Sequence, residues 1–191
     1  MGKISCDGKK NNLMHSFQKH YFDVVQKDLI LSENFSTVSQ LSAPKKIGLC
    51  LGGSSSDENY VIGCLAALKI ISGQKPYLTQ QKLTKTKNSG PKESVGAKVT
   101  LRGPSMYAFL YKLLFDVLPN IRQFEGLKTP AHENIYCFLL KDIFAFQELV
   151  PLFPYFEDLG SLQCQLHFTT KNKSEVVVLG NGLQLCFVPI D

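Results

Sequence analysis

The chain has 191 residues, of which 44% are hydrophobic, and it carries a formal net charge of +5. This length suits one domain, or one domain with an extension, and the apolar content is sufficient for a buried core. Because no run of about 20 apolar residues occurs, the sequence excludes a membrane-spanning helix and predicts no membrane partner.

The first 43 residues are expected to form a helix and a linker ahead of the main domain. Residues 1–12 are polar and contain neither an apolar signal segment nor an Arg-rich presequence. Apolar side chains recur at helical spacing over 13–31, and the polar segment 32–44 is typical of a linker. The main domain is therefore predicted to span 44–191.

A strand, a turn and a helix are predicted at the start of that domain. Residues 46–51 alternate between two faces, as a strand with one buried side does, and Gly52-Gly53 ends it. Ser55 and Glu58 have the spacing of a capping box, which predicts a helix with Ser55 as its N-cap. Gly73 is expected to end this helix.

The middle of the chain predicts a second strand–helix pair. Residues 76–86 are expected to be extended, and 87–95 to form a lysine-bearing loop. Residues 98–102 alternate again, and an apolar stripe over 106–117 predicts a helix that Pro119 stops.

The last third of the chain predicts more strands. Residues 135–140 and 163–169 have strand character, and 176–188 are interpreted as a hairpin around Gly180-Asn181-Gly182. Together these elements indicate an α+β domain, in which an antiparallel sheet has about three helices packed on one face.

Positive charge is concentrated between Lys75 and Lys98, where one acid, Glu93, accompanies six lysines. Such a block is typical of a surface that binds a polyphosphate. A solvated lysine face would have the same composition, and the residues leave both readings open.

The open faces of two predicted strands favour the first reading. Lys46, Gly48 and Cys50 share one such face, and Lys98, Thr100 and Arg102 share the other. If these strands are neighbours, they form a shallow, polar and basic surface suited to phosphates and ribose hydroxyls of RNA. The strand faces are predicted to expose no aromatic residue for base stacking, so recognition through shape and backbone is expected.

Enzymatic and metal-binding readings have weaker support. Gly52-Gly53-Ser54-Ser55 follows a strand but lacks the spacing of a phosphate-binding loop. The acid pairs Asp57-Glu58 and Glu157-Asp158 have no spacing that forces them to converge. The cysteines and histidines match no zinc module. We therefore predict no catalytic residue, no metal, no cofactor and no small-molecule substrate, and an enzyme built on the Gly52-Gly53 turn stays a minor alternative.

Four segments in order resemble the bacterial and organellar large-subunit ribosomal protein family called L-five. ISGQKP at 71–76 resembles its TGQKP, and GAKVTLRG at 96–103 resembles its GxKVTLRG. MYAFL at 106–110 and LPNIRQFEGL at 118–127 resemble its MYEFL and LPRxRDFxGL. The resemblance covers about residues 44–170.

This resemblance implies a five-stranded antiparallel sheet with helices on one side and a 5S ribosomal RNA (rRNA) site on the other. It implies a structural role at the central protuberance, with 5S rRNA, large-subunit rRNA and neighbouring ribosomal proteins as partners. Gln74 and Thr100 match RNA-contacting positions of the family. The full set of expected RNA-binding residues is Lys46, Cys50, Gln74, Lys75, Thr79, Lys98, Thr100 and Arg102.

The family loop between its second and third strands reaches toward the tRNA of the peptidyl site, and it maps onto about 81–95. Its lysines here, expected to face the tRNA, are Lys82, Lys85, Lys87 and Lys92. A contact with a protein of the small-subunit head is also implied.

Several departures from the family pattern bear on function. Cys50 stands where the family has Asn, the loop at 86–93 is rewritten, and the net charge is low for a ribosomal protein. Such drift favours a mitochondrial ribosome, with synthesis inside the organelle, over a plastid or the bacterial cytoplasm. An alternative is a protein-interaction module of the same ribosome that has lost most RNA contact.

Overall fold

A computed structural model describes residues 11–32, 37, 40–53, 57–80, 94–122, 124–130, 132–170 and 172–188. The chain divides into two compact units. Unit 1 comprises Met1–Lys46, Arg102–Tyr136 and Leu166–Asp191, and unit 2 comprises Ile47–Leu101 and Cys137–Gln165. Within the described ranges, no helix has the length and apolar character needed to cross a lipid bilayer.

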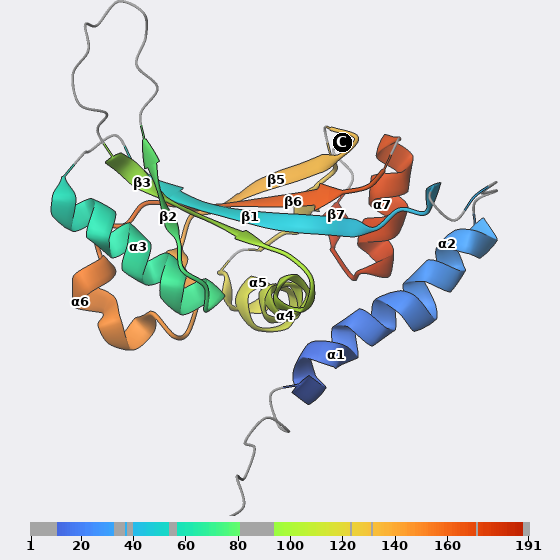
Figure 1. The fold of residues 1–191 in the computed structure, drawn as a ribbon, viewed down its shortest axis with the longest axis horizontal. Helices are drawn as coiled ribbons and strands as arrows, with labels where there is room; N and C mark the ends of the chain where they lie inside the picture. Colours follow the sequence, from blue (N-terminus) through green and yellow to red (C-terminus); the bar gives the residue numbers. More distant parts are fainter. Residues whose placement is uncertain are drawn as a thin grey trace, which may run out of the picture. The chain divides into compact units, whose positions relative to one another are not determined.

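A five-stranded antiparallel sheet of order β2-β3-β1-β6-β5 confirms the predicted α+β class (Figure 1). Its strands are β1 (Pro44–Gly52), β2 (Tyr77–Gln80), β3 (Ser94–Leu101), β5 (Ile135–Leu140) and β6 (Leu162–Phe168). The strands predicted at 46–51, 98–102, 135–140 and 163–169 are thereby confirmed. The extended segment predicted at 76–86 is confirmed for β2, while 81–86 lie outside the described residues. Of the loop predicted at 87–95, residues 87–93 also lie outside the described residues, and the prediction is wrong for 94–95, which belong to β3.

One face of the sheet forms the core of unit 2. Ile47, Leu49 and Leu51 of β1 are at most 1% exposed, as are Val99 and Leu101 of β3. This is the period-two burial that the alternating sequence predicted.

Helix α3 (Glu58–Ser72) lies along β2 and β3 and contacts α6 (Phe153–Phe156), as Figure 1 shows. Its apolar stripe is buried, and Gly73 ends it in the left-handed conformation with φ 66°, as predicted. The predicted N-cap is wrong, because Asp57 and not Ser55 precedes the first helical residue. Two 3-10 turns, Ile143–Ala145 and Val150–Leu152, lead from β5 to α6.

Unit 1 contains the predicted N-terminal helix. It runs as α1 (Asn11–His20), a π-helical turn (Tyr21–Val25) and α2 (Gln26–Ser32). It packs against α4 (Pro104–Lys112), which continues through a second π-helical turn (Leu113–Val117) into α5 (Leu118–Asn120). Pro119 therefore lies inside the last helical turn, one residue before the helix ends.

The hairpin predicted at 176–188 is wrong. Residues Lys173–Gly182 form helix α7, and only Phe187–Val188 are a strand, β7, which pairs in parallel with β4 (Leu127–Lys128). The buried residues of α7 are Glu175, Val176, Leu179 and Gly180, which is helical spacing. Three consecutive valines and an Asn-Gly pair favour a hairpin locally, but packing against the N-terminal helix of unit 1 overrides that preference.

Two polar contacts fix the start of α7 and one glycine fixes its end. The buried Glu175 carboxylate accepts hydrogen bonds from the Ser42 hydroxyl (3.3 Å) and the Asn172 side-chain amide (3.1 Å). A Cβ on Gly180 would lie 2.0 Å from the Phe187 ring, so the return of the chain over α7 requires glycine at 180.

Tyr21→Phe is expected to lower the free energy of unfolding by about 1–2 kcal/mol, because it leaves a buried carbonyl without its donor. The Tyr21 hydroxyl donates a hydrogen bond of 2.9 Å to the Ser42 carbonyl, and Tyr21 is 3% exposed. Urea denaturation measures the difference. Tyr155→Phe is the control, because Tyr155 is 79% exposed and should unfold like wild type. Equal losses in both variants would contradict the assigned contact.

Candidate nucleic-acid interface

The open face of the sheet in unit 2 is fixed by its registers. Gly48 lies opposite Thr100, and Cys50 lies opposite Lys98. On the other side of β3, Tyr77 of β2 also lies opposite Lys98. Residues directly opposite one another in a sheet share one face, so these five residues form a single surface, called here the open face. β1 and β3 are neighbours in the sheet, as the predicted polar and basic surface requires.

Small residues keep the open face shallow. A Cβ on Gly48 would lie 3.4 Å from the Gln165 side-chain oxygen and 3.9 Å from Cε of Lys98, which brings the side chain of Gln165 in β6 onto this face. A Cβ on Gly96 would lie 2.2 Å from the Leu51 carbonyl oxygen, so β3 approaches β1 more closely there than any other residue allows. Glycines within strands permit such close approach of a second backbone.

Positive charge on the open face comes from Lys98. Burial raises the pKa of the Cys50 thiol, and the nearby Lys98 ammonium opposes that rise. The thiol therefore stays protonated at neutral pH and does not neutralise the lysine. A thiol is a weak hydrogen-bond donor, so Cys50 offers less to an RNA acceptor than the Asn of the family pattern would.

Gln74 and Lys75 lie in the turn that joins α3 to β2. The Ser72 hydroxyl donates to the Leu68 carbonyl (2.6 Å) and accepts from the Gln74 backbone N–H (3.2 Å), which fixes the turn. Gln74 is half-buried and Lys75 is exposed. Because β2 runs antiparallel to β3 and begins beside Lys98, these two residues lie toward the Thr100 end of β3.

The structure brings together part of the predicted set. Cys50, Lys98 and Thr100 share the open face, and Thr79 of β2 lies opposite Gly96 on the same side. Lys46 lies in β1 and Arg102 directly follows β3, and both belong to unit 1. The four predicted tRNA-facing lysines, Lys82, Lys85, Lys87 and Lys92, lie outside the described residues.

Sequence reasoning missed two residues of this face, Tyr77 and Gln165. The prediction that the strand faces expose no aromatic residue holds for β1 and β3, but β2 adds one aromatic residue to the open face, because Tyr77 is 52% exposed beside Lys98. Alternation in β2 placed Tyr77 and Thr79 on one side, but only the register with β3 shows which side that is. Gln165 alternates with the buried Cys164 and Leu166, which was a usable signal.

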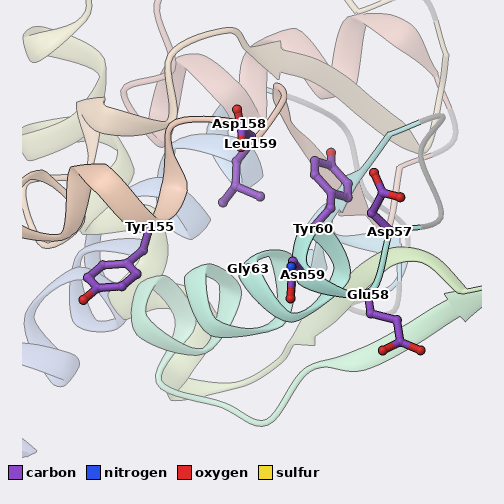
Figure 2. Close-up of a pocket in the computed structure, with 8 residues that line it drawn as sticks. All are labelled: Asp57, Glu58, Asn59, Tyr60, Gly63, Tyr155, Asp158 and Leu159. Atoms are coloured by element: carbon purple, nitrogen blue, oxygen red, sulfur yellow. The ribbon is translucent and has the colours of Figure 1, made fainter.

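A pocket between α3 and α6 gathers carboxylates from both acid pairs. Its lining includes Asp57, Glu58 and Asp158, with Tyr60 and Tyr155 (Figure 2). All three carboxylates are exposed, and Figure 2 shows the side chains of Asp57 and Glu58 pointing in different directions from the start of α3. General acid–base catalysis needs converging carboxyls, and this divergence does not provide them.

Tyr60 occupies the space beside the Gly52-Gly53 turn. A Cβ on Gly53 would lie 2.8 Å from the Tyr60 hydroxyl. Burial raises the pKa of Tyr60, and the neighbouring Cys64 adds to that rise. A phosphate-binding loop would need accessible backbone amides at this turn. The neutral Tyr60 phenol lies there instead, so the turn has a packing role. Within the described ranges, no group of three or more His, Cys, Asp or Glu could hold a metal ion.

Comparison with known proteins agrees with the resemblance found in the sequence. Residues 94–185 match the model of the C-terminus of the ribosomal L5 family. The large ribosomal subunit protein uL5m of Reclinomonas americana is 32% identical over 181 residues, which are 90% of this chain and 97% of that protein. The large ribosomal subunit protein uL5 of Mycoplasma pneumoniae is 31% identical over 180 residues, 92% of this chain and 99% of that protein.

A further relative, the uL5 protein of Borreliella afzelii, is 30% identical over 172 residues, which are 86% of this chain and 92% of that protein. Each of these three matches covers 86% or more of this chain. The chain therefore belongs to the uL5 family of large ribosomal subunit proteins.

Proposed function

We propose that this chain is a structural constituent of the large ribosomal subunit and binds 5S rRNA at the central protuberance through the open face. The observation that carries the proposal is the pairing of Lys98 with Cys50 and of Thr100 with Gly48. It sets one cation and one hydroxyl on a glycine-lined sheet surface. Family membership supports the ribosomal role, with rRNA and neighbouring ribosomal proteins as partners.

Binding by this face needs no covalent step. Lys98 neutralises a phosphate and releases its counterion, which supplies affinity without regard to sequence. The Thr100 hydroxyl and the Gln74 amide fix the register by hydrogen bonds to phosphate or ribose oxygens. Lys75 adds positive charge from the turn after α3.

The finer contacts follow from the family pattern. The lysines of residues 81–95 would reach the tRNA of the peptidyl site, Lys46 and Arg102 would hold rRNA from the strand ends, and a protein of the small-subunit head would be a further partner. We place the chain in a mitochondrial ribosome because of its low net charge and its likeness to the Reclinomonas uL5m protein. A plastid or bacterial ribosome is the alternative.

One observation favours a second candidate function. The neutral Cys50 thiol stands at the centre of the open face, where it offers RNA little. A chain that has lost most RNA contact would serve as a protein-interaction module of the same ribosome. The two functions differ in how binding depends on salt.

Lys98→Gln tests the RNA-binding proposal. The variant is expected to make the negative slope of log affinity against log salt for 5S rRNA shallower by about 0.7–0.9, because one phosphate contact is lost. Filter binding at several salt concentrations measures the slope. Lys69→Gln is the matched control, because Lys69 is an exposed lysine of α3, away from the open face. An unchanged slope for Lys98→Gln would remove this lysine from the interface.

A further inference from the structure

Tyr77 is an aromatic residue on the open face that takes no part in the RNA contacts proposed above. It is the first residue of β2, which is an edge strand of the sheet, and it is 52% exposed. Among the described residues its side chain has neither a ring partner nor a hydrogen-bond partner. Its neighbour Leu78 lies opposite Ala97, on the other side of the sheet, so the strand offers one aromatic ring to the open face.

The surroundings of Tyr77 distinguish it from an ordinary exposed aromatic. Single exposed aromatics are common on protein surfaces and mean little alone. Tyr77, however, lies opposite Lys98, which in turn lies opposite Cys50, and Thr79 of the same strand lies opposite Gly96. A flat ring beside a cation is the combination that binds single-stranded nucleic acid, through stacking and phosphate neutralisation.

We propose that Tyr77 is a stacking platform for one unpaired nucleobase of the RNA bound on the open face. This inference rests on the proposed RNA binding. The base lies against the exposed ring, and Lys98 neutralises the phosphate next to it. A base reaches the exposed ring only after it has left its own stack, so the site selects RNA with a looped-out base over a continuous duplex.

The ring accounts for selectivity that the charge cannot supply. A phosphate contact from Lys98 is the same for paired and unpaired RNA. Stacking on Tyr77 requires a base that has left its own stack, and RNA offers such bases in loops and bulges. Loss of the ring should therefore weaken binding to a looped RNA and leave binding to a duplex unchanged.

Tyr77→Leu in the full chain tests the proposal, because leucine keeps an apolar side chain and removes the ring. Filter binding to a 5S rRNA transcript is expected to show a loss of about 5- to 150-fold in affinity, the range for one base–aromatic stack. Tyr77→Phe keeps the ring and should bind within about twofold of wild type. The salt slope of Tyr77→Leu should match wild type, in contrast to Lys98→Gln.

Two controls isolate the effect. Tyr155→Leu makes the same change at an exposed tyrosine of α6 and should leave the affinity unchanged. A fully paired RNA duplex should bind wild type and Tyr77→Leu equally.

Ultraviolet crosslinking of the wild-type complex, followed by mass spectrometry, gives a measurement that does not depend on any variant folding. The peptide containing Tyr77 should carry a nucleotide adduct.

The outcomes separate this inference from the function on which it rests. If wild type binds 5S rRNA and Tyr77→Leu binds equally well, or if Tyr77→Phe loses as much affinity as Tyr77→Leu, the stacking role is overturned and RNA binding stands. If the wild-type chain binds no RNA, both are overturned. Selective loss in Tyr77→Leu, with the adduct on Tyr77 in the wild-type complex, supports the assignment.

Discussion

Gly96→Ala is expected to lower the free energy of unfolding by about 3 kcal/mol, because a methyl group has no room between β3 and β1. Its Cβ would lie 2.2 Å from the Leu51 carbonyl oxygen and 2.6 Å from Cα of Gly52. Both are backbone atoms of a strand in the middle of the sheet, so relief requires the strands to separate. Chemical denaturation followed by circular dichroism measures the loss.

Gly52→Ala is the matched control for that result, because Gly52 lies directly opposite Gly96 in the same strand pair. A Cβ on Gly52 would have the Val95 carbonyl oxygen at 3.5 Å as its nearest neighbour, which is ordinary contact. Alanine at 52 should therefore unfold close to wild type. Equal stability of the two variants would show that β1 and β3 do not approach as closely as described.

Gly48→Glu is expected to weaken binding to 5S rRNA by about 30-fold or more, since like charges brought together in an interface cost several kcal/mol. The new carboxylate would extend from the floor of the open face, near Lys98 and Gln165, and would meet the RNA phosphates. Filter binding at a fixed salt concentration measures the effect.

Gly48→Gln separates charge from bulk in that experiment, because glutamine has the size of glutamate without its charge. We expect a much smaller loss for Gly48→Gln than for Gly48→Glu. Both proteins should remain folded because Gly48 is not among the glycines with positive φ, and the three atoms nearest to an added Cβ belong to the side chains of Gln165 and Lys98. If the two variants bind equally, the open face does not lie against phosphates.

The pattern of residues close together in the sequence was sufficient to predict the buried sides of β1 and β3 and the end of α3. Alternation predicted which side of β1 and β3 is buried, and the structure confirms it with Leu49 and Val99 in the core. Gly73 marked the end of α3 because a left-handed residue is needed there. These features depend on residues close together in the chain.

The errors arose where distant residues decide the structure. At 176–178 the β-branched run favours a strand, yet Val176 and Leu179 are buried as one helical stripe within unit 1. Ser55 and Glu58 had suitable spacing for a cap, but the helix begins later, after Asp57. The prediction of an N-terminal extension over 1–43 stays a prediction.

The composition of the open face also required distant information. Tyr77 belongs to this face only because β2 pairs with β3 in the register that sets Tyr77 opposite Lys98, and nothing within residues 76–86 states that register. Gln165 reaches the face because β6 lies beside β1 in the sheet. Strand order and register are tertiary properties, which a single sequence specifies only through the whole fold.

Sedimentation of the tagged chain in an organelle lysate, with sequencing of the RNA that co-purifies at moderate salt, tests the central claim most directly. We expect the chain to migrate with the large ribosomal subunit and to enrich a short RNA of the 5S class. Migration with the subunit but without such an RNA would contradict 5S rRNA binding and favour the protein-interaction module. A free peak without RNA would contradict both functions.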